Sequence, residues 1–326
     1  MVIPQFQEIR TVLRQSPELV LCCHLDPDGD ALGSLLGLGL ALRNKGWQVQ
    51  LVSPDGIPSM YNFLPGAEDV STTITAFSNR AVAIVLDCGD LERLGPLASE
   101  VATAKQIINI DHHPTNTEFG TINWVEPRAA ATAEMVFSLL WELSIPVDLD
   151  IATCLYTGIH TDTGGFRYQN TTADVHKVAE TLLKIGVKPW EIADKVYDRK
   201  SLSQLRLLQQ ALERLQVSSS GLIAWVSLPY DRFGCYTDED IGGLINYPRM
   251  VASAEVAVLL RENDDRQVRV GFRSRHLVDV GLLAKRLGGG GHARAAGCIL
   301  SGSLTQVETQ VLAAVEKELQ EARNHA

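Results

Sequence analysis

The stretch ELVLCCHLDPDGDALGS, residues 18–34, decides the fold of the first part of the chain. Residues 18–23 have the composition of a buried strand, and residues 30–44 have the pattern of a helix. Between them stand one histidine and three aspartates. The same alternation continues outward from this stretch. Further strands are expected at 48–53, 81–87 and 106–110, a weaker one at 121–125, and further helices at 131–143 and 149–160.

This alternation is typical of βαβ units around a parallel sheet. The 326 residues, 45% hydrophobic and 21% charged, suit a globular protein of two domains. We therefore expect an α/β fold with an N-terminal doubly wound, mainly parallel sheet in residues 1–190, a helical linker in 191–217 and a smaller mixed α/β domain in 218–326. The elements expected in the last domain are strands at 222–228, 254–260, 267–274 and 298–301, with helices near 238–247, 279–287 and 304–322.

Composition excludes several classes of protein. No apolar run reaches the roughly 18 residues that a membrane span needs, and the N-terminus lacks a signal-peptide pattern, so we expect a cytoplasmic protein. The net charge of −10 argues against a grip on long duplex DNA, which needs many basic contacts to phosphates. The six cysteines show no C-x-x-C pair and are expected to be reduced and structural: Cys22, Cys23, Cys88, Cys154, Cys235 and Cys298.

Polar clusters follow three of the expected strands. They are His24–Asp30, Asp87–Asp90 and Asp111–His113, and Asp162 adds a carboxylate after a helix. In open α/β sheets, ligands bind beyond the carboxyl ends of the strands, so these clusters should line one crevice. Each alone also fits an acidic turn, a helix cap or a helix stop. Together they indicate a metal site, because crowded carboxylates repel one another unless a cation compensates them.

These clusters, in this order, resemble the motifs of the DHH phosphoesterase family. His24-x-x-x-Asp28-x-Asp30 resembles the first motif, Asp87 the second, Asp111-His112-His113 the third and Asp162 the fourth. The stretch GGGGHARAAG, residues 288–297, resembles the glycine-rich signature of the DHH-associated C-terminal domain, so the likeness covers nearly the whole chain.

Within the family, the size and the two-domain plan are most similar to the NrnA-type branch, which comprises oligoribonucleases that are also phosphatases of 3',5'-bisphosphoadenosine (pAp). The other branches fit less well. RecJ-type exonucleases carry extra domains, and membrane-bound cyclic-dinucleotide phosphodiesterases need spanning segments. Family II pyrophosphatases lack the glycine-rich motif.

The resemblance implies a site for two Mn²⁺ ions, which carboxylate and imidazole ligands suit, although Mg²⁺ or Co²⁺ also fit such ligands. Four aspartates would balance the charge of two divalent cations. Two ions about 3.5 to 4 Å apart can share a hydroxide for in-line attack on phosphorus. The implied ligands are His24, Asp28 and Asp87 for one ion, and Asp30, Asp87, His112 and Asp162 for the other, with Asp87 bridging.

Two residues of the third motif have other expected roles. Asp111 is expected to orient a ligating imidazole through its second ring nitrogen. His113 is expected to donate a hydrogen bond to a phosphoryl oxygen or to protonate the leaving oxygen. Asp26 matches no ligand position and is read as a turn residue.

The C-terminal domain is expected to bind the far end of the substrate. Consecutive glycines can form an anion nest, although a flexible turn after a helix is the plainer reading. The strand at 267–274 places arginines on one face, as a solvated edge strand would also do. The expected substrate-binding residues are Arg273, Arg275, Gly289, Gly290, Gly291, His292 and Arg294.

These expectations describe a two-metal phosphoesterase whose substrate lies between the domains. It would hydrolyse short RNA or DNA oligonucleotides to nucleoside 5'-monophosphates, and pAp to AMP and phosphate. Long duplexes and membranes are not expected partners, and a homodimer is left open. The alternatives are a pyrophosphatase or polyphosphatase, a phosphodiesterase for the products of cyclic dinucleotides, and a non-catalytic nucleotide-binding regulator.

Overall fold

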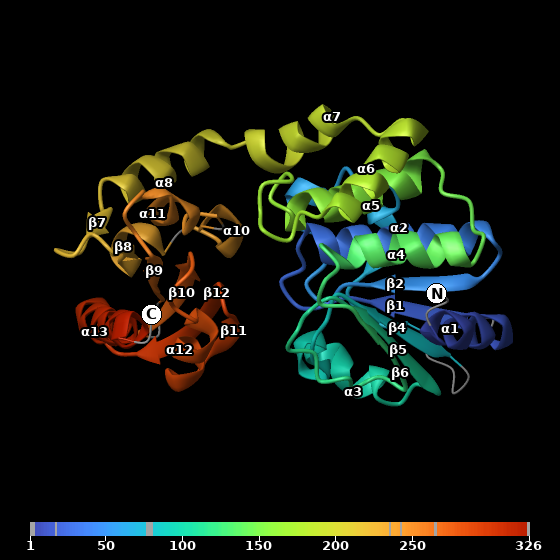
Figure 1. Cartoon of the computed structure of the whole chain (residues 1–326), viewed down its shortest axis with the longest axis horizontal. Helices are drawn as coiled ribbons and strands as arrows, with labels where there is room; N and C mark the ends of the chain where they lie inside the picture. The colour runs from blue at the N-terminus through green and yellow to red at the C-terminus, as the bar shows by residue number, and fades with distance from the viewer. Residues whose placement is uncertain are drawn as a thin grey trace. The chain divides into compact units, whose positions relative to one another are not determined.

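The computed structural model describes residues 4–16, 18–75, 81–234, 236–241, 243–263 and 266–324. The chain folds into two compact units, Met1–Arg199 and Lys200–Ala326 (Figure 1). Both combine helices with a sheet, which confirms the α/β fold class. Among the described helices, none is long and apolar enough to cross a membrane.

A parallel sheet forms the centre of the first unit. Its strand order is β3-β2-β1-β4-β5-β6, and every described pairing in it is parallel. The chain order reverses between β1 and β4, so the carboxyl ends of these strands flank a switch point where ligands bind in such sheets. The strands are β1 (Glu18–Cys22), β2 (Gln48–Val52), β3 (Val70–Ser71), β4 (Val82–Leu86), β5 (Gln106–Asp111) and β6 (Ile122–Val125).

Helices cover both faces of this sheet, as expected of a doubly wound fold. The longer ones are α1 (Pro4–Gln15), α2 (Gly29–Asn44), α4 (Thr132–Glu142), α5 (Leu149–Asp162) and α6 (Ala173–Ile185). The shorter ones are α3 (Ala98–Val101), α7 (Pro189–Ala193), η1 (Ser59–Tyr61), η2 (Ala67–Asp69), η3 (Leu91–Leu97) and η4 (Asp194–Asp198).

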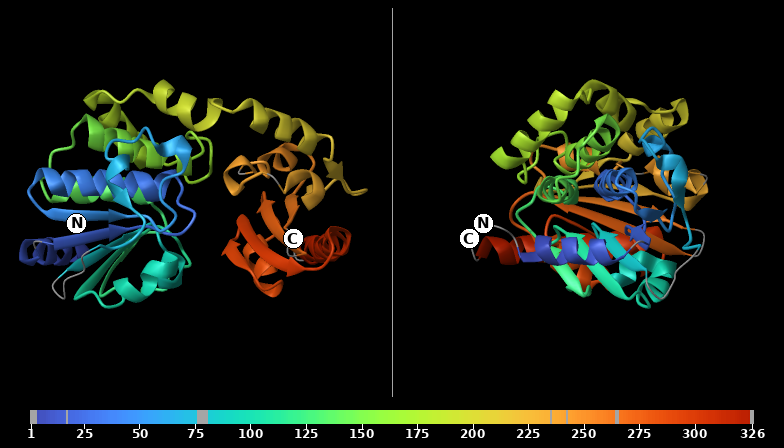
Figure 2. Two further views of the ribbon diagram at one scale, coloured as in Figure 1. Left: turned by 180° about the vertical axis from the view of Figure 1, so that it is seen from behind. Right: turned by 90° about the vertical axis from the view of Figure 1, so that its right-hand side faces the viewer.

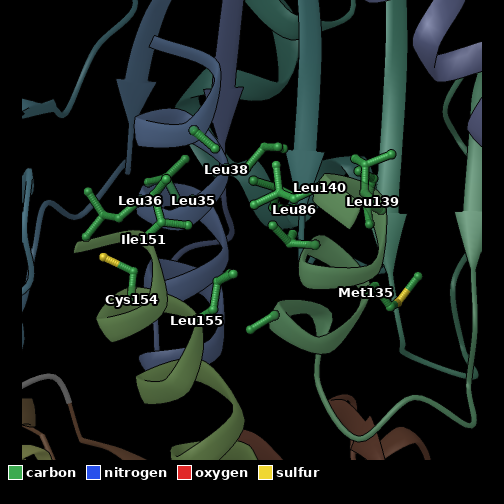
Figure 3. Packing of buried hydrophobic residues seen from close by; sticks show 14 of the residues in the cluster. Leu35, Leu36, Leu38, Leu86, Met135, Leu139, Leu140, Ile151, Cys154 and Leu155 are labelled. Atoms are coloured by element: carbon green, nitrogen blue, oxygen red, sulfur yellow. The ribbon is translucent and has the colours of Figure 1, made fainter. Parts of the chain in front are cut away.

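Alternate residues of β1 pack on opposite faces of the sheet, because successive side chains of a strand point in opposite directions. Leu19 and Leu21 join the large core formed with α2, α4 and α5, part of which Figure 3 shows. Val20 and Cys22 join a smaller core with η3 and α3. Helix α1 was not predicted from the sequence; its Phe6 packs edge-on against Trp124 of β6, with ring centroids 4.7 Å apart.

Glycines allow α2 and α5 to pack closely. A Cβ on Gly33 would lie 2.5 Å from the backbone oxygen of Cys154 and 2.9 Å from the backbone nitrogen of Gly158. A Cβ on Gly158 would lie 2.9 Å from Oδ1 of Asp30. This close packing brings the start of α2 and the end of α5 together, and both ends carry predicted metal ligands.

The second unit contains a mixed sheet of order β11-β12-β10-β9-β8-β7, in which β8 and β9 are parallel and the other described pairs are antiparallel. Helices α12 and α13 share a core with one face, and residues of α8, α9 and α10 share a core with the other. Figure 2 shows these elements from two further sides. The bounds are α8 (Leu202–Leu212), β7 (Gln216–Val217), β8 (Ile223–Leu228), α9 (Tyr230–Phe233), α10 (Asp238–Ile241), α11 (Asn246–Met250), β9 (Val256–Glu262), β10 (Gln267–Ser274), α12 (Val280–Arg286), β11 (Gly290–His292), β12 (Ala295–Ser301) and α13 (Leu304–Asn324).

The described cysteines are free and buried, namely Cys22, Cys23, Cys88, Cys154 and Cys298. Cys235 lies outside the described residues. Residues 191–217, expected to be a helical linker, contain the end of α7, η4, α8 and the short strand β7.

Candidate metal centre

The predicted metal ligands lie at the carboxyl ends of three adjacent strands and at two helix ends. His24 follows β1, Asp87 follows β4, and His112 follows β5. The side chain of Asp28 caps α2, because its Oδ1 accepts hydrogen bonds from the backbone nitrogens of Asp30 and Ala31 at 3.0 Å. Asp30 lies in the first turn of α2, and Asp162 is the last residue of α5. Asp28 is therefore a helix cap, one of the roles that each cluster alone also fits, and the cap uses one of its two carboxylate oxygens.

Asp87 occupies the middle of the site. Its Oδ2 lies 3.6 Å from Nε2 of His24, and its Oδ1 lies 3.6 Å from Nε2 of His112. Its φ of 56° is uncommon for a residue with a side chain and marks a position held by its surroundings. The two oxygens of one buried carboxylate thus face two different imidazoles.

Two groups of candidate ligand atoms lie at or next to the carboxylate of Asp87. Within each group, the atoms lie within 4.8 Å of one another. One comprises His24, Asp28 and Asp87, and the other comprises Asp30, His112 and Asp162. In the second group, Nε2 of His112 lies 3.6 Å from Oδ2 of Asp162 and 3.9 Å from Oδ2 of Asp30. The structure therefore brings together all six residues that the sequence analysis proposed as ligands.

Backbone carbonyls lie next to Nδ1 of both His24 and His112. Nδ1 of His24 lies 2.6 Å from the oxygen of Leu25, and Nδ1 of His112 lies 3.2 Å from the oxygen of Ala129. A carbonyl can only accept, so a ring that holds a single proton carries it on Nδ1 and has its lone pair on Nε2. Both lone pairs are then on the side of the carboxylates, which is the donor set that a divalent cation prefers.

The carboxylates are crowded. Burial, together with the charges of Asp87 and Asp162, raises the pKa of Asp30 well above its usual value. Burial also raises the pKa of Asp162 to about 7, against the opposing effect of His112. Burial acts in the same direction on Asp87, but hydrogen bonding to His24 and the charge of His113 outweigh it and lower the pKa of Asp87. Bound cations would relieve this repulsion, so the residues fit divalent metal ions.

Asp111 has a different partner from the one expected. Its Oδ1 lies 2.6 Å from Nδ1 of His113, whereas the proposed ligand His112 is oriented by Ala129. Asn116, which the sequence analysis did not identify, donates to Oδ2 of Asp111 at 2.6 Å. The prediction that Asp111 orients a ligating imidazole is therefore wrong for His112, because the backbone of Ala129 is already bonded to that ring.

The bond to Asp111 gives His113 a distinct character. Burial lowers the pKa of His113, but the hydrogen bond to Asp111 and the charge of Asp87 outweigh burial and raise this pKa to about 9. In the metal-free protein the ring then holds a proton at neutral pH, and in this form it can donate a hydrogen bond or act as an acid. His113 also forms a possible ligand group with Asp87 and His112, but Asp111 already engages its Nδ1.

Other residues near the site are placed as follows. Asp26 has a φ of 52°, and its backbone nitrogen donates to Oδ2 of Asp55 at 2.7 Å, so it is a turn residue as predicted. The hydroxyl of Thr132 donates to Oδ1 of Asp87, and Asn170 donates to Asp162. Sequence reasoning missed Thr132 and Asn170, because a threonine near a helix start and an asparagine in a loop are common without any such contact.

The predicted substrate-binding arginines belong to the second unit. Arg273 lies on β10, on the face opposite Val270 and Phe272, as the alternation predicted. Arg275 donates to the backbone oxygens of Arg249 and Val251 at 3.0 and 3.2 Å. Arg294 donates to the oxygen of Val278 at 2.9 Å. Arg275 and Arg294 therefore also hold loops of this unit in place.

The glycine-rich stretch is partly a strand rather than a loop. Residues 290–292 form β11, which pairs with β12. A Cβ on Gly289 or Gly291 would run into β12, whereas one on Gly290 would meet nothing within 4 Å. Close packing against β12 thus explains why Gly289 and Gly291 are glycines, but it does not explain Gly290. The side chain of His292 lies outside the described part of the structure.

Comparisons with known proteins cover both units. The model of the DHH family, N-terminal domain, matches residues 18–159, and that of the DHHA1 domain matches residues 227–321. A bifunctional oligoribonuclease and PAP phosphatase NrnA from Thermus thermophilus is 39% identical over 305 residues, which are 93% of this chain and 91% of the relative. A protein of the same name from Bacillus subtilis is 29% identical, over 86% of this chain and 88% of the relative. The crystal structure of an exopolyphosphatase-related protein from Bacteroides fragilis has a TM-score of 0.88 and 28% identity, covering 97% of this chain and 96% of that one.

Proposed function

The chain belongs to the DHH family, and from this premise we propose that it is a two-metal phosphoesterase. Its reactions are the hydrolysis of short oligonucleotides to nucleoside 5'-monophosphates and of pAp to AMP and phosphate. The names of the relatives from Thermus thermophilus and Bacillus subtilis support this choice of substrates. The resident ions are two Mn²⁺, with Mg²⁺ or Co²⁺ as substitutes.

The position of Asp87 carries the proposal. Its two oxygens lie 3.6 Å from Nε2 of His24 and 3.6 Å from Nε2 of His112, respectively. Asp87 would help to hold both cations; His24 and Asp28 would complete the ligands of one, and Asp30, His112 and Asp162 those of the other. The ions, when bound, supply activation of water and neutralisation of phosphate charge.

The chain's own residues complete the chemistry. His113, held by Asp111, donates a proton or a hydrogen bond to a phosphoryl or leaving oxygen. In the second unit, Arg273 supplies positive charge, and Gly290 leaves room for a ligand to approach the backbone of β11. Arg275, Gly289, Gly291, His292 and Arg294 belong to the same proposed binding surface.

Product identification tests this function. Metal-stripped protein is supplied with Mn²⁺ and given a 5'-labelled dinucleotide, pAp or pyrophosphate. We expect nucleoside 5'-monophosphates from the dinucleotide and AMP from pAp, and no products without metal. A strong preference for pyrophosphate would instead support the pyrophosphatase alternative, and no turnover of any substrate would support the regulator.

Two variants locate the activity at the proposed site. Asp87→Asn keeps the size of the side chain but removes the charge that faces both imidazoles, and it should abolish turnover of every substrate. Asp26→Asn is the matched control, because Asp26 is an exposed turn residue of the neighbouring loop. Equal activity in the two variants would contradict the assignment.

A further inference from the structure

The segment that leads into α4, residues 129–133, contacts several proposed metal ligands. We call it the α4-entry segment. The backbone oxygen of Ala129 lies 3.2 Å from Nδ1 of His112. The backbone nitrogens of Thr132 and Ala133 donate to Oδ2 and Oδ1 of Asp30 at 2.6 and 2.9 Å. Both oxygens of Asp30 are therefore held by the first amides of one helix.

The side chain of Thr132 extends this contact to the central carboxylate. Its Oγ1 donates to Oδ1 of Asp87 at 3.0 Å, and this is the oxygen that faces His112. Thr132, Asp30 and Asp87 are all buried. Because a buried carboxylate oxygen that loses its donor has little water to replace it, this hydroxyl has a larger effect on orientation than one on the surface.

A fourth ligand is connected through Asn170. Its Nδ2 lies 2.9 Å from the backbone oxygen of Ala130, and 3.1 and 3.3 Å from the backbone oxygen and Oδ2 of Asp162. The α4-entry segment thus reaches Asp30, Asp87, His112 and, through Asn170, Asp162. These four residues are the ligands proposed for one of the two ions.

The ligands specific to the other ion are held elsewhere. His24 is oriented by the backbone oxygen of Leu25, and Asp28 by the first turn of α2. The groups that orient the ligands of the two metal positions are therefore different, although Asp87 is a proposed ligand in both positions.

We propose that the α4-entry segment, acting through the hydroxyl of Thr132, is the positioning element of the metal position formed by Asp30, Asp87, His112 and Asp162. The inference rests on the proposed two-metal function. Thr132 is a positioning residue, since it contacts carboxylates that hold the ion and not the ion itself. Its loss should weaken one of the two ions and leave the other nearly unchanged.

The test uses Thr132→Val, which replaces the hydroxyl by a methyl group of similar size. Thr132→Ser keeps a hydroxyl, and Thr157→Val is the matched control, because Thr157 is also buried but donates to the backbone oxygen of Thr153. Calorimetric titration of the metal-free, full-length protein with Mn²⁺ measures the number and affinity of bound ions. Electron paramagnetic resonance detects the coupling between paired Mn²⁺ ions.

We expect two ions in wild type, Thr132→Ser and Thr157→Val. In Thr132→Val one ion should bind with unchanged affinity and the other about 10 to 100-fold more weakly, as for other residues that support a metal ligand. The signal of coupled ions should be lost at stoichiometric Mn²⁺. Asn170→Ala, which removes the link to Asp162, should weaken the same ion and provides a second test if Thr132→Val does not fold.

Double variants identify which ion is affected. Thr132→Val combined with His24→Ala should leave neither ion tightly bound, whereas Thr132→Val combined with His112→Ala should add little to His112→Ala alone. Wild-type affinities in both Thr132→Val and Asn170→Ala, or equal weakening of both ions, would overturn the inference. Failure of the wild-type protein to bind two ions would instead overturn the proposed function.

Discussion

The carboxylate of Asp111 and the ring of His113 are joined by a 2.6 Å hydrogen bond. Asp111 is fully buried, and Asn116 donates to its other oxygen. This pair lies beside the proposed metal ligands. The crowded carboxylates there repel one another, whereas the Asp111 carboxylate and the protonated His113 ring carry opposite charges and attract one another. The pair therefore gives the site a protonated imidazole next to a cluster of carboxylates.

The first prediction concerns pH in the metal-free protein. The pKa of His113 is raised from its usual 6.5 to about 9, so the folded protein binds this proton more tightly than the unfolded chain does. The resulting stabilisation is complete below about pH 6.5 and is lost as the pH rises through about 9. Asp111→Asn removes the main cause of the raised pKa, and should lower the free energy of unfolding by about 2 to 3 kcal/mol below pH 6.5 and by less at pH 9.

Denaturant unfolding of wild type and Asp111→Asn at pH 6, 7.5 and 9 measures this difference. Glu142→Gln in the same unit is a control for the loss of an unrelated carboxylate. Its effect on the free energy of unfolding should not depend on pH in the way expected for Asp111→Asn. A stability difference between wild type and Asp111→Asn that grows toward pH 9 would contradict the assignment of the proton to His113.

A second prediction compares two glycines on the same face of α2. A Cβ on Gly33 would meet backbone atoms of Cys154 and Gly158, which cannot move without shifting α5. A Cβ on Gly37 would meet the side chain of Leu155, which can change its rotamer. Gly33→Ala should cost about 1 to 3 kcal/mol of stability and also weaken Mn²⁺ binding, because it separates Asp30 from Asp162. Gly37→Ala should have the smaller effect on both, and the reverse order in thermal unfolding and metal titration would show that close helix packing does not set the site.

A third prediction concerns the glycine-rich stretch. Gly289→Ala should destabilise the second unit, because the added Cβ meets the backbone oxygen of Gly297. Gly290→Ala should leave stability unchanged and raise KM for pAp and dinucleotides several-fold with little change in kcat. Steady-state kinetics and thermal unfolding of both variants separate these roles. An unchanged KM in Gly290→Ala would show that β11 is not part of the binding surface.

A fourth prediction uses two arginines of β10. Arg273 and Arg269 lie on the same strand and face, and Arg269 is the more exposed. Arg273→Ala should raise KM or change the preference between pAp and dinucleotides, while kcat stays close to that of wild type. Arg269→Ala, as the matched control, should change neither. The same effect in both variants would indicate general electrostatic attraction and not a specific contact.

Most of the fold follows from local pattern. The alternation of apolar strands with helices predicted the parallel sheet, and the strand at 267–274 was predicted with the bounds it has in the structure. Elements whose stability depends on distant partners were missed. Helix α1 is one, since Phe6 finds its partner Trp124 far along the chain. Strand β11 is another, because consecutive glycines carry no strand signal until β12 pairs with them.

The candidate site could be predicted to the level of its ligands, because strand ends in a parallel sheet meet at one edge. The groups that orient those ligands could not be predicted. Ala129 orients His112 through a backbone oxygen, which any residue type would supply. Likewise, the partner of Asp111 depends on which way a loop turns, and sequence spacing alone did not distinguish His112 from His113.

Anomalous diffraction from crystals grown with Mn²⁺ tests the central claim most directly. We expect two peaks in the first unit, one between His24 and Oδ2 of Asp87 and one between His112 and Oδ1 of Asp87. A single peak, or two peaks that do not share Asp87, would contradict it.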